Sequence, residues 1–246
     1  LKIEHLMALR LNLNFNNGEK RLKVKVISYS QPPNLKIYDQ EENNLETIED
    51  LIAYCARVSN PSNQANKETN SKLIQYLASH SHWSPFEMVS VCMEVETTRD
   101  IARQILRHKS FGFQEFSMRY SNPIEEDLGF VIREARLQDF KNRQNSVEVD
   151  DEDLQEDWVM KQKEVIELVK TNYKWAIDKG IAKEQARVIL PEGNTVSKMY
   201  INGTIRSWIH YCELRSKHGT QKEHTEITLA IADLIAKIFP TITKFI

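Results

Sequence analysis

The alternation of residues 88–97 constrains the fold of this chain more than any other segment does. Polar side chains occupy every second position, and the apolar positions between them are Val89, Val91, Met93 and Val95. A period of two is that of a β-strand with one face in the core. We therefore predict a half-buried strand in this segment.

The rest of the chain combines two more alternating segments with several helical periods. Residues 22–29 and 114–121 alternate, and helical spacing covers 45–58, 70–80, 98–109, 153–179, 182–189, 205–217 and 223–238. This order predicts one α+β domain over residues 21–246, with a small, largely antiparallel sheet covered by long helices. Residues 1–20 are polar and Asn-rich, and we expect a loose N-terminal extension there.

Composition and charge exclude several classes of protein. The 33 basic and 35 acidic residues give a net charge of −2, which is unfavourable for a general nucleic-acid or acidic-membrane surface. No apolar run approaches the roughly 20 residues of a membrane helix, and the N-terminus lacks a signal core. The three cysteines form no C-x-x-C pair, so neither a disulfide framework nor a metal site is expected. These features predict a cytoplasmic protein.

The charges are segregated along the chain. Residues 148–157 hold seven acidic residues, whereas 99–119 hold six basic ones (counting one histidine) against two acids. We interpret 140–157 as an acidic, solvated insertion that runs into the beginning of a helix, where carboxylates suit the helix dipole.

The densest polar cluster covers residues 103–121. On a helix, Arg103 and Arg107 share one row and Gln104 and His108 another. On the strand expected at 114–121, one face carries Glu115, Ser117 and Arg119, and the other carries Phe116, Met118 and Tyr120. Such cations can hold a phosphate, and the glutamate can orient an amide-type ring. The pattern alone equally fits a basic last helical turn followed by a solvated strand face.

Five ordered elements resemble the flavin-dependent thymidylate synthases. Arg107-His108-Lys109, seven residues and then Ser117 resemble that family's R-H-R, seven residues, S signature. The other four resemble its A-R-V-S, H-x-H-x-[ST]-P-F-E, A-R-x-x-L-P and R-S-W-x-H-F-x-x-L-R elements; they lie at 56–59, 80–87, 186–191 and 206–215.

This resemblance implies reductive methylation of dUMP to dTMP, with FAD as hydride carrier and NADPH and methylenetetrahydrofolate as co-substrates. It implies dUMP contacts at Gln104, Arg107, Glu115, Phe116, Ser117, Met118, Arg119, Arg187 and Arg215. It implies FAD contacts at Ser59, His82, Ser84, Arg107, His108, Lys109, Glu115, Thr204, Arg206 and His210. It also implies a homotetramer in which each flavin is held by several chains.

The chemistry of uracil distinguishes two ways of activating its carbon 5. One adds a cysteine thiolate at carbon 6, but Cys55, Cys92 and Cys212 all fall at packing positions of predicted elements. The other ionises N3 of the ring, and a guanidinium against that edge stabilises the anion. The resemblance puts Arg215 there, so we predict that Arg215 is the catalytic residue. We expect Ser117 to position the substrate rather than attack it.

Two further sequence features bear on this hypothesis. Lys109 replaces the usual second arginine of the signature, which keeps the charge but loses the bidentate fork. Arg206 and His210 share a helix face, while Arg215 points to the other side, as expected of a site shared between subunits. The alternatives are a nucleotide- or flavin-binding protein without turnover and an RNA-binding protein that uses the basic segment.

Overall fold

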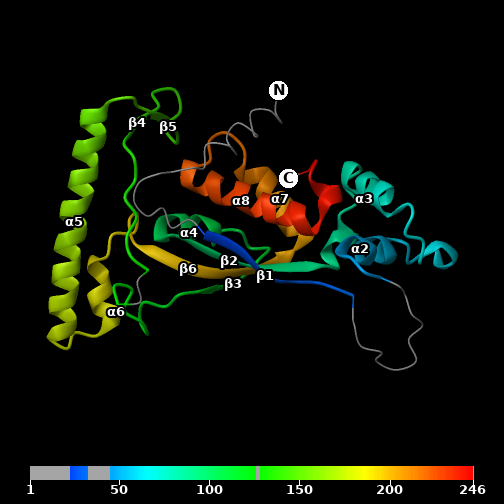
Figure 1. Cartoon of the computed structure of the whole chain (residues 1–246), viewed down its shortest axis with the longest axis horizontal. Coiled ribbons are helices and arrows are strands. Elements are labelled where there is room, and N and C mark those ends of the chain that lie inside the picture. The colour runs from blue at the N-terminus through cyan, green and yellow to red at the C-terminus, as the bar shows by residue number, and fades with distance from the viewer. Residues whose placement is uncertain (1–22, 33–44, 126–127, 246) are drawn as a thin grey trace.

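The computed structural model describes residues 23–32, 45–125 and 128–245, and it confirms the predicted α+β class (Figure 1). A four-stranded antiparallel sheet has the strand order β1 (Lys23–Tyr29), β2 (Ser90–Thr98), β6 (Val196–Thr204), β3 (Gly112–Glu115). The predicted extension at 1–20 lies outside the described residues. No helix in the described part of the chain is long and apolar enough to cross a membrane.

The two central strands carry the core face of the sheet. Met93 pairs with Ile201 and Val95 with Met199, and all four side chains are buried. The opposite face of β2 carries Glu94, which is only 6% exposed because it pairs with Lys25 of β1 at 2.9 Å. The strand predicted at 88–97 is therefore confirmed, and ion pairs cover much of its polar face.

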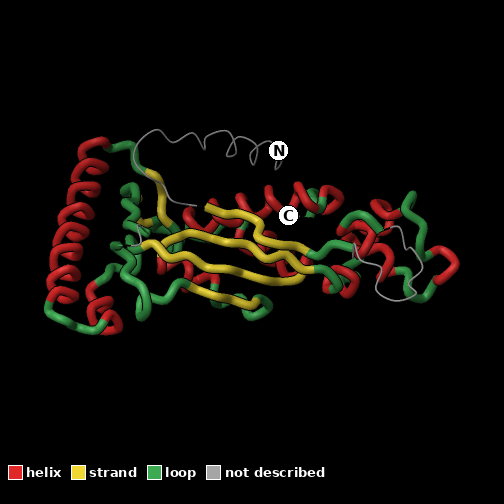
Figure 2. Tube along the Cα trace, turned by 60° about the horizontal axis from the view of Figure 1, so that its bottom comes forward, coloured by secondary structure: helices red, strands yellow, loops and turns green. Residues whose placement is uncertain are grey.

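Three helices cover the apolar face of the sheet: α4 (Arg99–Ile105), α7 (Ile205–Arg215) and α8 (Lys222–Ile238) (Figures 1 and 2). Trp208 of α7 is fully buried, and its indole Nε1 donates to the carbonyl of Val91 at 3.0 Å. The principal core thus lies between this helical layer and the sheet.

Smaller groups of helices lie at the two ends of the long axis (Figure 1). One end has α2 (Ile48–Ala56), α3 (Asn70–Ser79) and the short 3-10 helix η2 (Ser84–Glu87). The other has α5 (Glu152–Asp178) and α6 (Lys183–Ala186), packed on a second core around Met118 and Tyr173. Asp151 caps α5 by accepting from the backbone N–H of Leu154, which fits the interpretation of the acidic tract. Just before it, β4 (Arg136–Gln138) and β5 (Ser146–Glu148) form a hairpin.

The strand predicted at 114–121 is wrong in its bounds. Strand β3 ends at Glu115, because the chain then turns: the N–H groups of Tyr120 and Ser121 both donate to the carbonyl of Ser117. Met118 is consequently buried in the second core while Tyr120 is 82% exposed, so the predicted shared face does not exist. The preceding helix also ends early, at Ile105 instead of 109.

Strand β6 was not predicted. Its core face carries Ser197 and Gly203 beside Met199 and Ile201, and this mixture hides the alternation. Gly203 is required there, since a Cβ would lie 2.3 Å from the ring of Phe111.

Candidate active site

Four cationic or imidazole side chains meet where α4, α7 and α8 come together, and we call this group the arginine corner: Arg107, His108, Lys109 and Arg215. Arg107 to Lys109 lie in the turn after α4, and Arg215 is the last residue of α7. The Nε of Arg215 donates to Nε2 of His108 at 2.9 Å. Within the described part of the chain, none of the three cations forms an ion pair with a carboxylate.

His108 is uncharged in this environment. Burial, followed by the positive charges of Arg215 and Arg107, lowers the pKa of His108 to about 4. Because the Nε2 of a neutral imidazole can accept a hydrogen bond, His108 fixes the guanidinium of Arg215 without adding a second charge. The Nη groups of Arg215 have no partner among the described residues and can therefore bind a ligand.

Glu115 lies on the helix-covered face of the sheet, where its carboxylate is already engaged. Arg103 of α4 donates to both oxygens at 3.0 Å, and the hydroxyl of Ser197 donates to Oε1 at 2.9 Å. Ser117, beyond the end of β3, forms no hydrogen bond with it. Glu115 is therefore not positioned as a base for Ser117.

A second group of predicted site residues lies at the α6 end of the molecule. Arg119 forms an ion pair with Glu184 at 3.3 Å, and Arg187 Nε donates to the carbonyl of the same residue at 3.3 Å. Met118 is buried beneath this loop with Phe116 against the same cluster, and Ser117 is partly exposed. Two arginines, both in contact with Glu184, and one hydroxyl therefore lie at the same place.

A third group lies around η2 and the beginning of α7. Arg206 pairs with Glu87, and the ring of His210 contacts Trp83 edge-on at 4.8 Å. The hydroxyl of Thr204 caps α7 by accepting from the N–H of Ser207. Helix α7 therefore directs Arg206 and His210 towards η2 and Arg215 towards His108, as the predicted two faces require. The side chains of His82 and Ser84, just before and at the start of η2, are exposed.

Ser59 lines a surface cavity of about 630 Å³ between α2 and α3, together with Lys72 and Tyr76. Arg57, which belongs with Ser59 to the A-R-V-S sequence element, is buried and donates to Asn70 Oδ1 at 2.7 Å. Asn70 in turn donates to Asp50. This network holds the loop that presents Ser59.

One chain brings these residues together only within each group. Figure 1 shows α6 and α2 at opposite ends of the long axis, so the group beside α6 and the group at the end of α2 lie far apart.

The buried side chains behind the arginine corner were missed. His224 of α8 is fully buried and contacts Gln104 and Tyr211. The sequence carried one signal: the element that contains Tyr211 resembles a motif with Phe at that position, and a hydroxyl in a core requires a partner.

All three cysteines lie in environments that oppose a thiolate. Cys212 is 1% exposed, and burial raises the pKa of its thiol to about 12. Burial also raises the pKa of Cys55 and of Cys92.

Comparisons with known proteins agree with this picture. The family model described as thymidylate synthase complementing protein matches residues 42–241. The probable flavin-dependent thymidylate synthase of Paramecium bursaria Chlorella virus 1 is 45% identical over 223 residues, covering 91% of this chain and 98% of the relative. The flavin-dependent thymidylate synthase of Synechocystis sp. is 52% identical over 194 residues, covering 79% and 87%.

Among solved structures, a UMP/dUMP methylase, PolB from Streptomyces cacaoi, bound with 5-Br dUMP, has the same fold. Its TM-score is 0.73 at 23% identity, and the match covers 91% of this chain and 93% of that one. The resemblance noted in the five sequence elements is thereby confirmed: the chain belongs to the thymidylate synthase complementing protein family of flavin-dependent thymidylate synthases.

Proposed function

We propose that this protein methylates dUMP reductively at carbon 5 to give dTMP. The observation that carries the proposal is the arginine corner, where Arg215 and Arg107 lie near a neutral histidine and Lys109 follows it in the chain, all three cations without carboxylate partners in the described chain. Such a site favours an anion or an ionised ring. The family relationship identifies the expected anionic ligands as dUMP and the flavin cofactor.

We also propose that the protein is cytoplasmic, because its free cysteines, none in a C-x-x-C pair, favour that compartment.

The residues present fit FAD. Its pyrophosphate needs exposed cations, and Arg107 and Lys109 are exposed and have no ion pair among the residues that the structure describes. From a neighbouring copy, Ser59, His82, Ser84, Thr204, Arg206 and His210 would complete the binding site. When bound, FAD would carry electrons from NADPH to the methylene group delivered by methylenetetrahydrofolate.

Arg215 is the proposed catalytic residue. Its Nε is held by His108, so its free Nη groups can meet the N3/O4 edge of uracil and stabilise the N3 anion. Ionisation at N3 pushes electron density onto carbon 5, which becomes the nucleophile. The raised thiol pKa values support this route, because no cysteine here is prepared to add to carbon 6.

The other proposed dUMP residues position the substrate. Arg119 and Arg187, with the hydroxyl of Ser117, offer a phosphate two guanidinium groups and a hydrogen-bond donor. Phe116, which is partly exposed, would contact the nucleotide, and Met118, buried in the second core, would support Phe116 from behind. Gln104 would contact the edge of the pyrimidine. Glu115 keeps Arg103 in place and has a free lone pair for a ligand donor.

We also propose a homo-oligomer with shared sites, as expected of the family's homotetramer. The separation of the three groups within one chain supports it, and so does an apolar stripe on α5. Leu154, Trp158, Val165, Leu168 and Trp175 recur at intervals of three, four or seven and are 36–61% exposed. Two copies related by a two-fold axis could pack these stripes against each other.

The direct test is to purify the protein, record its flavin absorbance, and measure NADPH oxidation and dTMP formation with and without dUMP. We expect a yellow protein that forms dTMP only when all three substrates are present. A protein that takes up no FAD would contradict the proposal. Binding of FAD and dUMP without any dTMP would establish the non-catalytic alternative instead.

The oligomer has its own test. Leu168→Glu places a charge on the exposed stripe of α5 without touching either core, so it should lower the mass seen by sedimentation. Wild-type protein that sediments as a fully active monomer would contradict the shared site.

A further inference from the structure

His224 and Tyr211 form a buried chain of hydrogen bonds that ends on a proposed substrate residue. His224 is 0% exposed and lies in the first turn of α8. Its Nε2 lies 2.9 Å from the hydroxyl of Tyr211, and its Nδ1 lies 3.2 Å from Oε1 of Gln104. We propose that Tyr211 and His224 are positioning residues that fix the side-chain amide of Gln104 for pyrimidine nucleotide binding. This inference rests on the proposed function.

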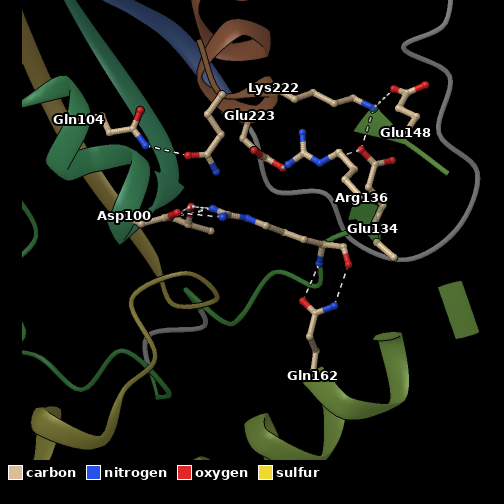
Figure 3. A network of polar contacts seen from close by, with 12 residues as sticks. Asp100, Gln104, Glu134, Arg136, Glu148, Gln162, Lys222 and Glu223 are labelled. Carbon is tan, nitrogen blue, oxygen red and sulfur yellow. Dashed lines mark hydrogen bonds and ion pairs between the residues drawn. The ribbon is translucent and has the colours of Figure 1, made fainter. Parts of the chain in front are cut away.

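The hydrogen-bond partners determine the direction of the chain. Nε2 of Gln104 donates to Oε1 of Gln221 at 2.8 Å, the contact drawn as a dashed line from Gln104 in Figure 3. Oε1 of Gln104 is therefore the atom that faces His224. An amide oxygen can only accept, and therefore His224 donates from Nδ1. Nε2 of the neutral ring is then an acceptor, and the hydroxyl of Tyr211 donates to it. Each ring nitrogen of His224 therefore has one hydrogen-bond partner.

The surroundings keep this arrangement in one protonation state. Burial, and then the positive charge of Arg215, lower the pKa of His224 to about 3. The hydroxyl of Thr228 donates to the carbonyl of His224, and that of Thr225 donates to the carbonyl of Arg215. The beginning of α8 is thereby tied both to the histidine and to the end of α7.

The consequence for a ligand is a preoriented amide. Gln104 keeps one N–H and one oxygen lone pair free, and it precedes Arg107 by one helical turn. An amide held from behind does not have to be ordered when a nucleotide binds, and so the chain should raise affinity more than turnover. The phenylalanine common at the position of Tyr211 in the family could not make this contact.

The test compares two buried tyrosines in the flavin-loaded protein. Tyr211→Phe removes the donor to His224, while Tyr173→Phe removes a hydroxyl that has no hydrogen-bond partner among the described residues. By calorimetry, Tyr211→Phe should weaken dUMP binding roughly five- to tenfold, and Tyr173→Phe less than about twofold. The KM for dUMP should rise by the same factor while kcat stays within about twofold.

A double-mutant cycle identifies the path of the effect. In a Gln104→Ala background, Tyr211→Phe should change dUMP affinity by less than about twofold, because the amide it orients is gone. His224→Asn, which retains a donor near the place of Nδ1, should keep more affinity than His224→Leu.

Two failures are distinguishable. If the wild-type protein does not bind dUMP, the proposed function is overturned. If the wild-type protein binds dUMP but Tyr211→Phe has no effect, or the same effect with and without Gln104, the positioning role is overturned.

Discussion

Two polar clusters that meet at the beginning of α8 differ in how their positive charges are balanced. In the first, the arginine corner, Arg215 is held by a hydrogen bond to the neutral His108, and the cations have no carboxylate partners in the described chain. The second, which we call the ion-pair cluster, lies between α4, α8 and the β4–β5 hairpin (Figure 3). Its members are Asp100, Arg133, Glu134, Arg136, Glu148, Lys222 and Glu223.

Every cation of the ion-pair cluster has at least one acid. Arg133 donates to both oxygens of Asp100 at 2.8 Å, and Lys222 lies 2.7 Å from Glu134 and 2.6 Å from Glu148. Within this cluster the balanced charges join α4, α8 and the hairpin, and they leave little net potential for a ligand. The arginine corner instead keeps a net positive potential, which can attract an anion.

Removing the catalytic cation should have the largest effect. Arg215→Ala should lower kcat for dTMP formation by roughly 100- to 1000-fold or more, because it removes the group that stabilises the N3 anion. Flavin content should stay close to wild type, in contrast to Arg107→Ala, which should lose FAD. Activity is measured as dTMP formed per bound flavin. A loss of flavin in Arg215→Ala equal to that in Arg107→Ala would show that Arg215 has another role.

The matching change in the ion-pair cluster should act on stability instead. Arg136 pairs with Glu223, and the two side chains are only 12% and 16% exposed. Arg136→Met leaves that carboxylate buried without its partner, which should cost about 3 kcal/mol of unfolding free energy in urea. The folded variant should keep its dTMP activity. A stable but inactive Arg136→Met protein would erase the distinction between the clusters.

Acid should reveal the buried histidines. The groups that face His224 are Arg215 and Tyr211 from α7, Gln104 from α4 and His108 after it. Burial first, and then the positive charge of Arg215, lower the pKa of His224 to about 3 and that of His108 to about 4. The unfolded chain therefore binds more protons than the folded one below about pH 6.5. Stability should be complete above that pH and fall towards pH 5, before most carboxylates titrate. In His224→Leu, urea unfolding should show a shallower fall over this window, whereas an identical slope would contradict the neutral histidine.

The sequence predicted those parts that depend on local pattern. The strand at 88–97 and the helix at 205–217 were found because their periods are strong. Strand β6 was missed because Ser197 and Gly203 occupy core positions, and Gly203 is dictated by the distant ring of Phe111. The motif located the arginine corner, but the contact between Tyr211 and His224 joins residues 13 apart across the loop between two helices. Only the fold could show that these side chains meet behind Gln104.

The smallest expected effect tests how strictly the corner depends on charge alone. Lys109 is exposed and has no ion pair within the described chain, so it offers a phosphate a single ammonium group. Lys109→Arg supplies a planar fork at the same net charge and should tighten FAD binding roughly two- to fivefold, measured by flavin fluorescence titration. Lys23→Arg on β1 is the matched control and should change nothing. Because charge is constant, any gain at residue 109 comes from bidentate geometry. Weaker binding in Lys109→Arg would mean that the compact ammonium fits a restricted position that the arginine corner imposes.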